Sequence, residues 1–356
     1  MKIRNASHQS TSAISVVIPM YNAEKYIGEC LTSLANQTFQ DFDVIVVDDC
    51  STDNSRAIVN NFFDTFGGRL KLKKLSKNSG YPGLPRNSAL DMVRGKYVYF
   101  LDSDDLLSET AFEELYTVAE KFNADVVHSD KYFTFDDEKG LSSAESETFQ
   151  RSEFVTEPTL ITDDIGERVA GFVQRKYLWW ACNKLFRRQF LRDNKIKFPA
   201  TKSWEDFIFI FSCLVSAKNY VRVPFVSYYY RFREDSMSRN AGNIIEISKR
   251  AFVVCSALDK VMESKTFFRD NPQYRYAVLD FFIKDRLSVT SKYLFADNAS
   301  PAAVFDFFYK NIFSFNPQDN VALTAYLFVM VNALTLYSKQ QATEIKSLKK
   351  KLEVSS

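Results

Sequence analysis

The sequence predicts an α/β fold with a mostly parallel central sheet flanked by helices, and two observations lead to this class. Apolar, strand-like runs alternate with amphipathic, helix-like runs from residue 14 to about residue 130, as in a parallel sheet covered by helices. Several strand-like runs end abruptly in aspartates, at the edge where open α/β sheets bind ligands. From about residue 243 the apolar spacing is helical, so we expect a C-terminal helical appendage.

The expected elements follow one another in a regular order along the chain. Buried strands are expected at residues 14–18, 42–47, 70–75, 97–101 and 125–130. Alternating lysines place the third of these near an edge of the sheet. Helices begin after Asn22 and Asp53, which can cap them, and a third helix ends at Gly95. A further amphipathic helix, which Ser108 can cap, runs to about residue 123.

Composition excludes several classes of function. The 356 residues include 46 Lys and Arg against 44 Asp and Glu, and this net charge of +2 gives no reason to expect nucleic acid as a partner. Five cysteines without a C-x-x-C pair indicate reduced thiols and a cytoplasmic protein. Only His8 and His128 are present, which excludes a multi-histidine zinc site. His128 lies in an apolar run and is interpreted as a packed strand residue, so a catalytic base must be a carboxylate.

The two ends of the chain give weaker signals. Residues 1–13 are polar without an apolar segment, so we expect a disordered leader and no secretory signal. Residues 321–337 form the most apolar segment, but they are few and include polar side chains. We therefore expect a buried or membrane-apposed helix there and not a membrane span.

The strand-like run at residues 97–101 is followed by Asp102, Ser103, Asp104 and Asp105. Side chains two apart on a strand share a face, so Asp102 and Asp104 can converge on one point while Ser103 points away. Two such carboxylates suit Mg²⁺ or Mn²⁺, which leave the rest of their coordination shell to water and substrate phosphates. The alternative is an acidic strand-to-helix turn in which Ser108 caps the helix and the aspartates are solvated.

The turn after the first strand, PMYNAEKY, contains no glycine, and the chain has no P-loop motif. A dinucleotide-binding Rossmann unit needs glycines at this turn, so the sequence does not predict one. A bound nucleotide diphosphate would have to be neutralised by a metal and by basic side chains. Arg86 is a candidate for the second cation, and an exposed arginine at a helix start is its alternative interpretation.

Five motifs in this order resemble the signatures of family 2 glycosyltransferases with the GT-A fold: PMYN at 19–22, VDDCSTD at 47–53, Arg86-Asn87, FLDSDD at 100–105 and WED at 204–206. The resemblance is strong over residues 14–130 and extends to about residue 235. It implies that residues 14–130 are the nucleotide-sugar-binding half of a GT-A domain and residues 131–240 its acceptor-side half. Residues 241–356 are then the helical C-terminal region.

The resemblance also implies roles for single residues. Asp49 would bind the nucleotide base, usually uracil, beside the turn from Pro19 to Tyr21. Asp102 and Asp104 would contact ribose and metal, and Arg86 the nucleotide. Cys50 stands where glycine or asparagine is more usual in the family.

Asp206 would be the base that activates the acceptor hydroxyl, with Glu205 supporting it. Its alternative interpretation is a helix capping box that begins at Ser203.

Other candidate contacts rest on single residues. Ser103 lies between the two metal-site aspartates and is included with them as a substrate contact. Trp180 and Lys184 could line an acceptor pocket, since aromatic faces suit sugar rings, or could belong to the core. In the segment YYYRFR, Arg231 is the arginine expected to close on the diphosphate.

The combined hypothesis is an inverting glycosyltransferase that uses Mn²⁺ or Mg²⁺ as cofactor. Its donor would be a UDP-hexose or UDP-N-acetylhexosamine, and its acceptor a hydroxyl of a bacterial surface glycan or lipid-linked glycan. The protein would be cytoplasmic, with peripheral contact to the inner face of the cell membrane or self-association through the C-terminal helices. A sugar nucleotidyltransferase and a non-catalytic binding protein on the same fold are the two alternatives.

Overall fold

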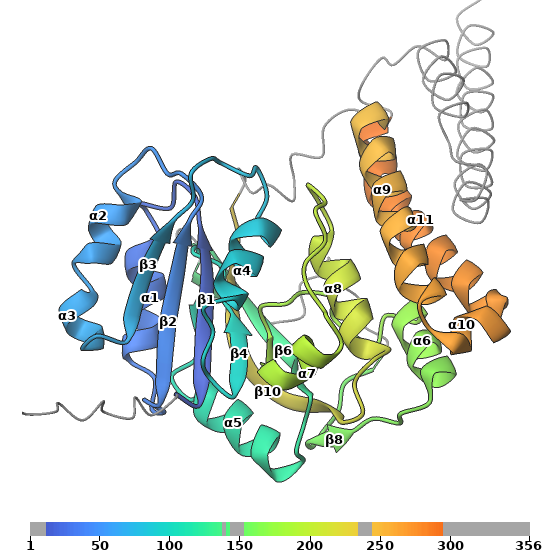
Figure 1. Ribbon diagram of the computed structural model, residues 1–356, viewed down its shortest axis with the longest axis horizontal. Coiled ribbons are helices and arrows are strands. Elements are labelled where there is room, and N and C mark those ends of the chain that lie inside the picture. Colours follow the sequence, from blue (N-terminus) through green and yellow to red (C-terminus); the bar gives the residue numbers. More distant parts are fainter. Residues whose placement is uncertain (1–11, 137–139, 143–152, 234–243, 295–356) are drawn as a thin grey trace, which may run out of the picture. The chain divides into compact units, whose positions relative to one another are not determined.

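The computed structural model describes residues 12–136, 140–142, 153–233 and 244–294, and the chain divides into two compact units between residues 236 and 237 (Figure 1). The first unit is built on a sheet whose strands follow the order β3-β2-β1-β4-β9-β6-β10-β5, with β7 and β8 paired at the side. Helices cover its faces, so the predicted α/β class is confirmed.

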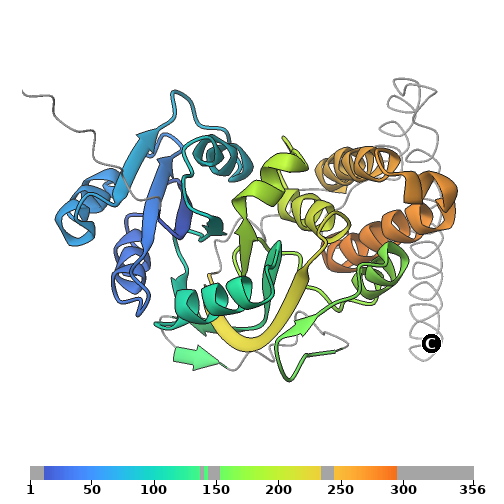
Figure 2. The ribbon, with the colours of Figure 1, turned by 60° about the horizontal axis from the view of Figure 1, so that its bottom comes forward.

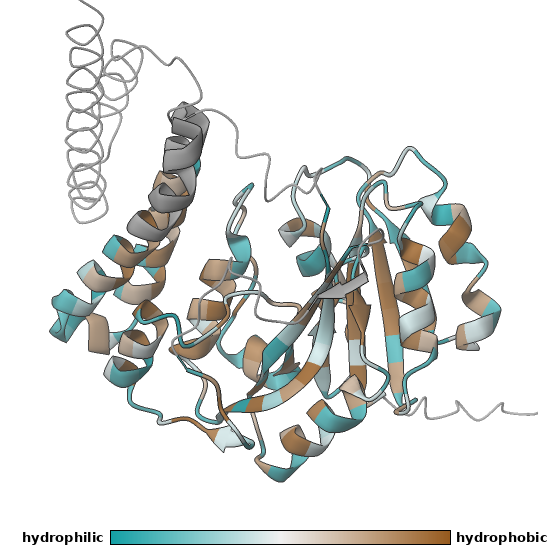
Figure 3. Cartoon of the chain, turned by 180° about the vertical axis from the view of Figure 1, so that it is seen from behind, coloured by the Kyte–Doolittle hydropathy of each residue, from teal (hydrophilic) through white to brown (hydrophobic). Residues whose placement is uncertain are grey.

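The first half of the sheet is parallel. It consists of β1 (Ile14–Met20), β2 (Phe42–Asp48), β3 (Leu70–Lys74) and β4 (Tyr97–Phe100). Every residue of β1, β2 and β4 is buried, which explains their almost continuous apolar sequences (Figure 3). The helices between and after these strands are α1 (Ile27–Ala35), α2 (Ser55–Asn60), α3 (Phe63–Phe66), α4 (Gly83–Leu90) and α5 (Ala111–Lys121).

The second half of the sheet is mixed. Strand β9 (Lys184–Arg187) pairs antiparallel with both β4 and β6 (Val126–Asp136), and β10 (Tyr220–Arg231) runs parallel to β6. Strand β10 curls around this side of the molecule (Figure 2) and has register shifts near Val226. The remaining elements are β5 (Leu106–Leu107), β7 (Gly140–Ser142), β8 (Thr159–Leu160), α6 (Ile165–Val173), α7 (Arg188–Asp193) and α8 (Glu205–Leu214).

A cluster of aromatic rings fixes helix α8 against the sheet. Phe209 of α8 stacks on Phe198 with ring centroids 4.0 Å apart, and both pack on Phe100 of β4 at 5.0–5.6 Å. Aromatic pairs of this kind add about 0.5–1.5 kcal/mol each beyond their buried area. The start of α8 is thereby held close to the end of β4.

The second unit is helical over its described residues, as expected. It contains α9 (Ile244–Glu263), α10 (Thr266–Asp270) and α11 (Pro272–Leu294). Leu258, Phe268 and Phe282 are fully buried, and Arg275 pairs with Asp259 at 2.7 Å. Among the described residues no helix is long and apolar enough to span a membrane. Ala13, the last residue of the leader expected at 1–13, is buried and its N–H donates to the Asp41 carbonyl at 3.0 Å, so the expectation of disorder is wrong at this residue. The expectations for residues 1–11 and 321–337 lie outside the described residues.

Gly95 was predicted to end a helix, but α4 already ends at Leu90, so this expectation is wrong. Its role is close packing: its N–H donates to the Ser15 hydroxyl at 2.9 Å, and an added Cβ would lie 2.6 Å from the Ser15 nitrogen. Backbone atoms of β1 cannot move aside without disturbing the sheet. Only glycine therefore fits at the entrance to β4.

We predict that Gly95→Ala lowers the free energy of unfolding by about 2–4 kcal/mol, because it overpacks the backbone of β1. The matched control is Gly28→Ala inside α1, where the added Cβ makes an ordinary contact with Ile58 at 3.7 Å. Alanine is the better helix former, so this variant should be as stable as the wild type or up to about 1 kcal/mol more stable. Urea denaturation measures both. Equal effects of the two substitutions would contradict the packing argument.

Candidate active site

The candidate site lies at the carboxyl ends of the parallel strands. The register pairs Met20 with Asp48 and Val17 with Phe100, so β1, β2 and β4 end at one edge of the sheet. The chain segments that follow these ends carry Tyr21, Asp49 and Asp102. Predicted residues from three motifs are therefore brought to the same edge by the parallel topology alone.

Asp49 is held by the loop that precedes α4. Its carboxylate accepts hydrogen bonds from the backbone N–H of Ser79 at 2.9 and 3.0 Å and from the Ser79 hydroxyl at 2.8 Å. The Asn78 amide also donates to the Asp49 carbonyl at 3.0 Å. These hydrogen bonds fix the orientation of the Asp49 carboxylate. Ser79 and Asn78 were missed in the sequence because loop residues carry no periodic signal.

Two turns with positive φ shape this edge. Asn22 follows β1 with φ 47° and Cys50 follows β2 with φ 65°. The Asn22 side chain accepts from the Thr52 N–H at 2.8 Å, which joins the two turns. A left-handed conformation suits glycine and asparagine best, which gives a physical reason for their usual occurrence at the position of Cys50. Tyr21 is 50% exposed in the first turn, whereas Pro19 is buried inside β1.

Arg86 is the centre of the site. Its guanidinium lies 2.7 Å from an oxygen of Asp102, 2.6 Å from Asp206 and 3.2 Å from Glu205. Its side chain is 2% exposed and packs over the Phe198 ring, so the alternative of an exposed arginine is wrong. Burial alone would lower the pKa of Arg86, but Asp206 and Asp102 raise it well above its ordinary value. One cation thus joins three carboxylates, one from the segment after β4 and two from the start of α8.

The start of α8 presents the Glu-Asp pair to this guanidinium. Its N-cap residue is Trp204, with φ 59° and no capping side chain, so the alternative of a capping box from Ser203 is wrong. Asp206 instead bonds Arg86 and accepts from the Ala181 N–H at 3.3 Å. Burial and the neighbouring Asp206 raise the pKa of Glu205 to about 7, and burial also raises the pKa of Asp206.

The three aspartates after β4 have separate partners. Asp102 pairs with Arg86, Asp104 pairs with Arg233 at 2.8 Å, and Asp105 accepts from the Tyr228 hydroxyl and the Arg231 N–H. They are therefore not simply solvated. Helix α5 begins after Thr110 without a capping side chain, so a Ser108 cap is also wrong. Asp105 binds the strand end to β10, a structural role that the sequence did not reveal.

Asp102 and Asp104 fit a hard divalent cation by the chemistry of their oxygens. Burial and the charge of Asp102 raise the pKa of Asp104, which a nearby positive charge would offset. Among the described residues no group of three or more His, Cys, Asp or Glu side chains could hold a metal ion. A cation here would therefore complete its shell with phosphate and water oxygens, as Mg²⁺ and Mn²⁺ do.

Three predicted contacts lie in packed surroundings. Trp180 packs against Tyr132 and Tyr230, with ring centroids 4.7 and 5.6 Å away. Lys184 is fully buried and donates to the Trp180 carbonyl at 2.6 Å. Arg231 is 2% exposed and donates to the Asp104 carbonyl at 2.8 Å. Their candidate roles in binding stay predictions, and Ser103 is half-buried beside the site.

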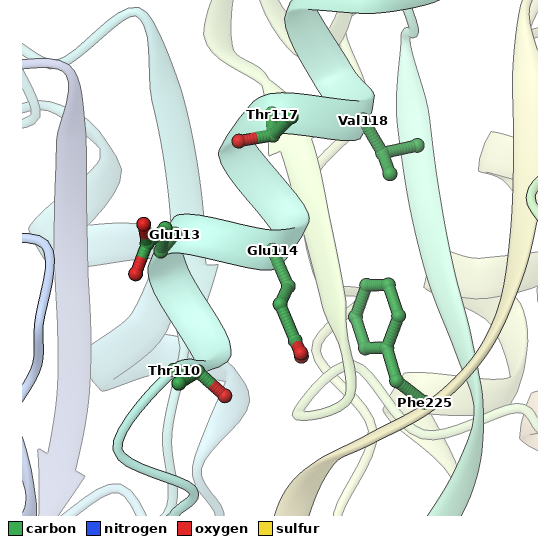
Figure 4. A pocket seen from close by; sticks show the side chains of 6 residues that line it. All are labelled: Thr110, Glu113, Glu114, Thr117, Val118 and Phe225. Atoms are coloured by element: carbon green, nitrogen blue, oxygen red, sulfur yellow. The ribbon is translucent and has the colours of Figure 1, made fainter.

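A hollow lies elsewhere on the first unit, between α5 and β10 (Figure 4). It is lined by Thr110, Glu113, Glu114, Thr117, Val118 and Phe225. Figure 1 shows α5 at the end of the sheet where β1 and β2 begin, opposite to the candidate site. No residue of the five motifs lines this hollow, so we do not assign the site to it.

The fold and the strand-end carboxylates together define a GT-A domain, which is the architecture of nucleotide-sugar-dependent glycosyltransferases. Residues 15–178 match the family described as Glycosyl transferase family 2. The match covers PMYN, VDDCSTD, Arg86 and FLDSDD.

Several relatives and solved structures are similar to this chain. Poly(ribitol-phosphate) beta-N-acetylglucosaminyltransferase TarS of Staphylococcus aureus strain Mu50 is 33% identical over 224 residues, which are 62% of this chain and 36% of TarS. TarP of S. aureus strain N315, of the same description, is 34% identical over 58% of this chain and 59% of TarP. The chain thus spans about a third of TarS and three fifths of TarP. The crystal structure of S. aureus TarS 1-349 in complex with UDP has a TM-score of 0.54 at 26% identity, covering 76% of this chain and 80% of that chain.

We predict that Glu205→Gln removes a pH dependence of stability. Between pH 4.5 and 7 the folded protein holds a proton on Glu205 that the unfolded chain has lost, because the pKa is 4.5 ordinarily and about 7 in the fold. The free energy of unfolding of the wild type therefore falls as pH rises through this window, by at most about 3 kcal/mol. Urea denaturation at pH 5 and 7.5 should show a smaller fall for E205Q. The exposed Glu157→Gln should follow the wild type, and identical behaviour of E205Q and wild type would contradict the assignment.

Proposed function

We propose that this protein is an inverting glycosyltransferase that transfers a hexose or N-acetylhexosamine from a UDP-sugar to a hydroxyl of a bacterial surface glycan. One observation carries the proposal: a single buried guanidinium holds both Asp102, a donor-side carboxylate, and Asp206, the candidate base. Transfer to a hydroxyl needs the leaving diphosphate and the base on either side of one sugar carbon. The Arg86 cluster supports such an arrangement.

The relatives support the choice of donor and acceptor. TarS and TarP are described as forming a beta-linked product on poly(ribitol phosphate), and TarS has been crystallised with UDP-GlcNAc. Transfer from an α-linked UDP-sugar to a β-linked product inverts the anomeric carbon. We therefore propose a polyol-phosphate or related cell-surface polymer as the acceptor class. Cytoplasmic location and peripheral membrane contact stay predictions.

The chemistry assigned to each part follows from its environment. Asp206 accepts the proton of the attacking hydroxyl, and its raised pKa makes it a better base than a solvated aspartate. Arg86 keeps this carboxylate ionised and oriented. A divalent cation held by Asp102 and Asp104 would neutralise the charge that develops on the leaving diphosphate. Tyr21 offers an exposed ring on which a base can stack, next to Asp49.

We predict that UDP binds at least about tenfold more tightly than CDP, because cytosine presents an acceptor to the Asp49 carboxylate where uracil presents an N–H donor. Isothermal titration with both nucleotides in the presence of Mn²⁺ measures the ratio. In Asp49→Asn the ratio of the affinities for UDP and CDP should fall towards one, since an amide can donate as well as accept. Equal affinity of the wild type for both nucleotides would remove Asp49 from the base-binding site.

We predict that Asp206→Asn lowers kcat by at least about a hundredfold while the Kd for UDP stays within about threefold of the wild type. Asparagine retains the shape of the side chain but cannot accept a proton. The measurement is UDP release from UDP-glucose and UDP-GlcNAc with a poly(ribitol phosphate) acceptor and Mn²⁺. Asp91→Asn, at the exposed end of α4, is the matched control.

Undiminished turnover in D206N would reject the base assignment. Two other outcomes would reject the reaction class. Release of pyrophosphate from UTP and a sugar phosphate would show a nucleotidyltransferase, and nucleotide binding without turnover across donors and acceptors would show a binding protein.

A further inference from the structure

The two metal-site aspartates already have cationic partners, and these partners differ in how firmly they are held. Arg86 pairs with Asp102 at 2.7 Å and is 2% exposed, in contact with two further carboxylates. Arg233 pairs with Asp104 at 2.8 Å, and its side chain is 24% exposed. Arg233 lies beyond the end of β10, with its guanidinium over the Tyr26 ring at 4.8 Å. Arg86 is thus buried in the core, whereas Arg233 is partly exposed.

Neighbouring carboxylates need positive charge whether or not a metal is present. Burial and Asp102 both raise the pKa of Asp104, while Arg233 lowers it. A metal ion at Asp104 and the guanidinium of Arg233 would each neutralise the same carboxylate. Both cations on the same oxygens would repel each other strongly where the surroundings are only partly aqueous.

We propose that Arg233 is the counter-ion of Asp104 in the metal-free protein, and that a divalent cation binds by displacing its guanidinium. The displaced guanidinium stays at the same edge of the sheet and donates to the phosphates of the bound donor. This proposal rests on the proposed function, because it takes Asp104 as a metal ligand. It assigns to Arg233 the diphosphate contact that the sequence suggested for Arg231.

The neighbouring Arg231 explains why the exchange is confined to one side chain. Arg231 is anchored: its backbone N–H donates to Asp105 at 2.7 Å, and its guanidinium pairs with Glu29 and packs on Phe135. Residues two apart in an extended chain share a face, so this anchor keeps Arg233 near Asp104. The backbone is thus held at Arg231, and the proposed exchange moves only the Arg233 side chain.

The test compares the affinities of the wild type and its variants for Mn²⁺ in the absence of nucleotide. Binding is measured as the loss of the free Mn²⁺ signal in electron paramagnetic resonance. Arg233→Gln should bind Mn²⁺ at least about fivefold more tightly than the wild type, because no guanidinium has to leave. Arg233→Lys retains a positive charge that competes with the metal, so its affinity for Mn²⁺ should be close to that of the wild type. Arg192→Gln, an exposed arginine on α7, controls for the change in net charge, and Asp104→Asn should lose the site.

A second measurement separates competition from a structural effect. With Mn²⁺ at saturation, R233Q should bind UDP at least about threefold more weakly than the wild type, because the displaced cation is missing. We expect R233Q to bind Mn²⁺ more tightly and UDP more weakly than the wild type. Equal thermal unfolding midpoints of R233Q and the wild type would show that the variant is folded.

Unchanged or weaker Mn²⁺ binding by R233Q overturns the proposal, as does UDP binding by the wild type without any bound Mn²⁺. A wild type that binds Mn²⁺ but no UDP contradicts the proposed function, while the Mn²⁺ comparison still decides the role of Arg233.

Discussion

The buried guanidinium of Arg86 is the interaction on which the rest of the site depends. Asp102, Glu205 and Asp206 converge on it from β4 and α8, more than one hundred residues apart in the chain. Carboxylates at such short range repel one another, and removing the cation between buried charges typically costs about 3–5 kcal/mol. Burial and the neighbouring Asp206 raise the pKa of Glu205, and the opposing effect of Arg86 offsets them only in part. The site is therefore held in a charged, partly compensated state, which suits a group that must accept a proton.

Both ion pairs and hydrogen bonds balance the negative charge at the end of β4. The sequence predicts that a metal held by Asp102 and Asp104 neutralises a bound nucleotide diphosphate, because the turn after the first strand has no glycine. The structure shows two arginines paired with these aspartates, one buried and one partly exposed, and the third aspartate accepts from a hydroxyl and a backbone N–H. The fold can thus form without metal, because each carboxylate has a partner. In the proposed function a metal ion would therefore serve the leaving diphosphate and not the stability of the fold.

The sequence predicted what depends on local pattern and missed what depends on distant contacts. The buried runs of β1, β2 and β4 and the order of the motifs follow from hydrophobicity and spacing, and the fold class was correct. The capping box at Ser203 and the Ser108 cap were wrong, because tertiary packing places Trp204 and Thr110 at those helix starts. The burial of Arg86 could not be seen, since Phe198 and Asp206 reach it only in the folded chain. Arg233 lies two residues after Arg231 in YYYRFR. Because residues two apart in an extended strand share a face, strand geometry could have identified Arg233 as a second candidate for the diphosphate contact.

One short segment connects Asp49, the predicted base-binding residue, to Asp206, the predicted catalytic base. Ser79 holds the carboxylate of Asp49, and four residues later Gly83 begins the helix that carries Arg86. A Cβ on Gly83 would lie 3.1–3.3 Å from Tyr81, Phe198 and Glu205, so this turn is packed directly against the start of α8. The loop that holds Asp49 and the helix start that carries Asp206 are thus joined in two ways: by the six residues between Ser79 and Arg86, and by the close approach of Gly83 to Glu205.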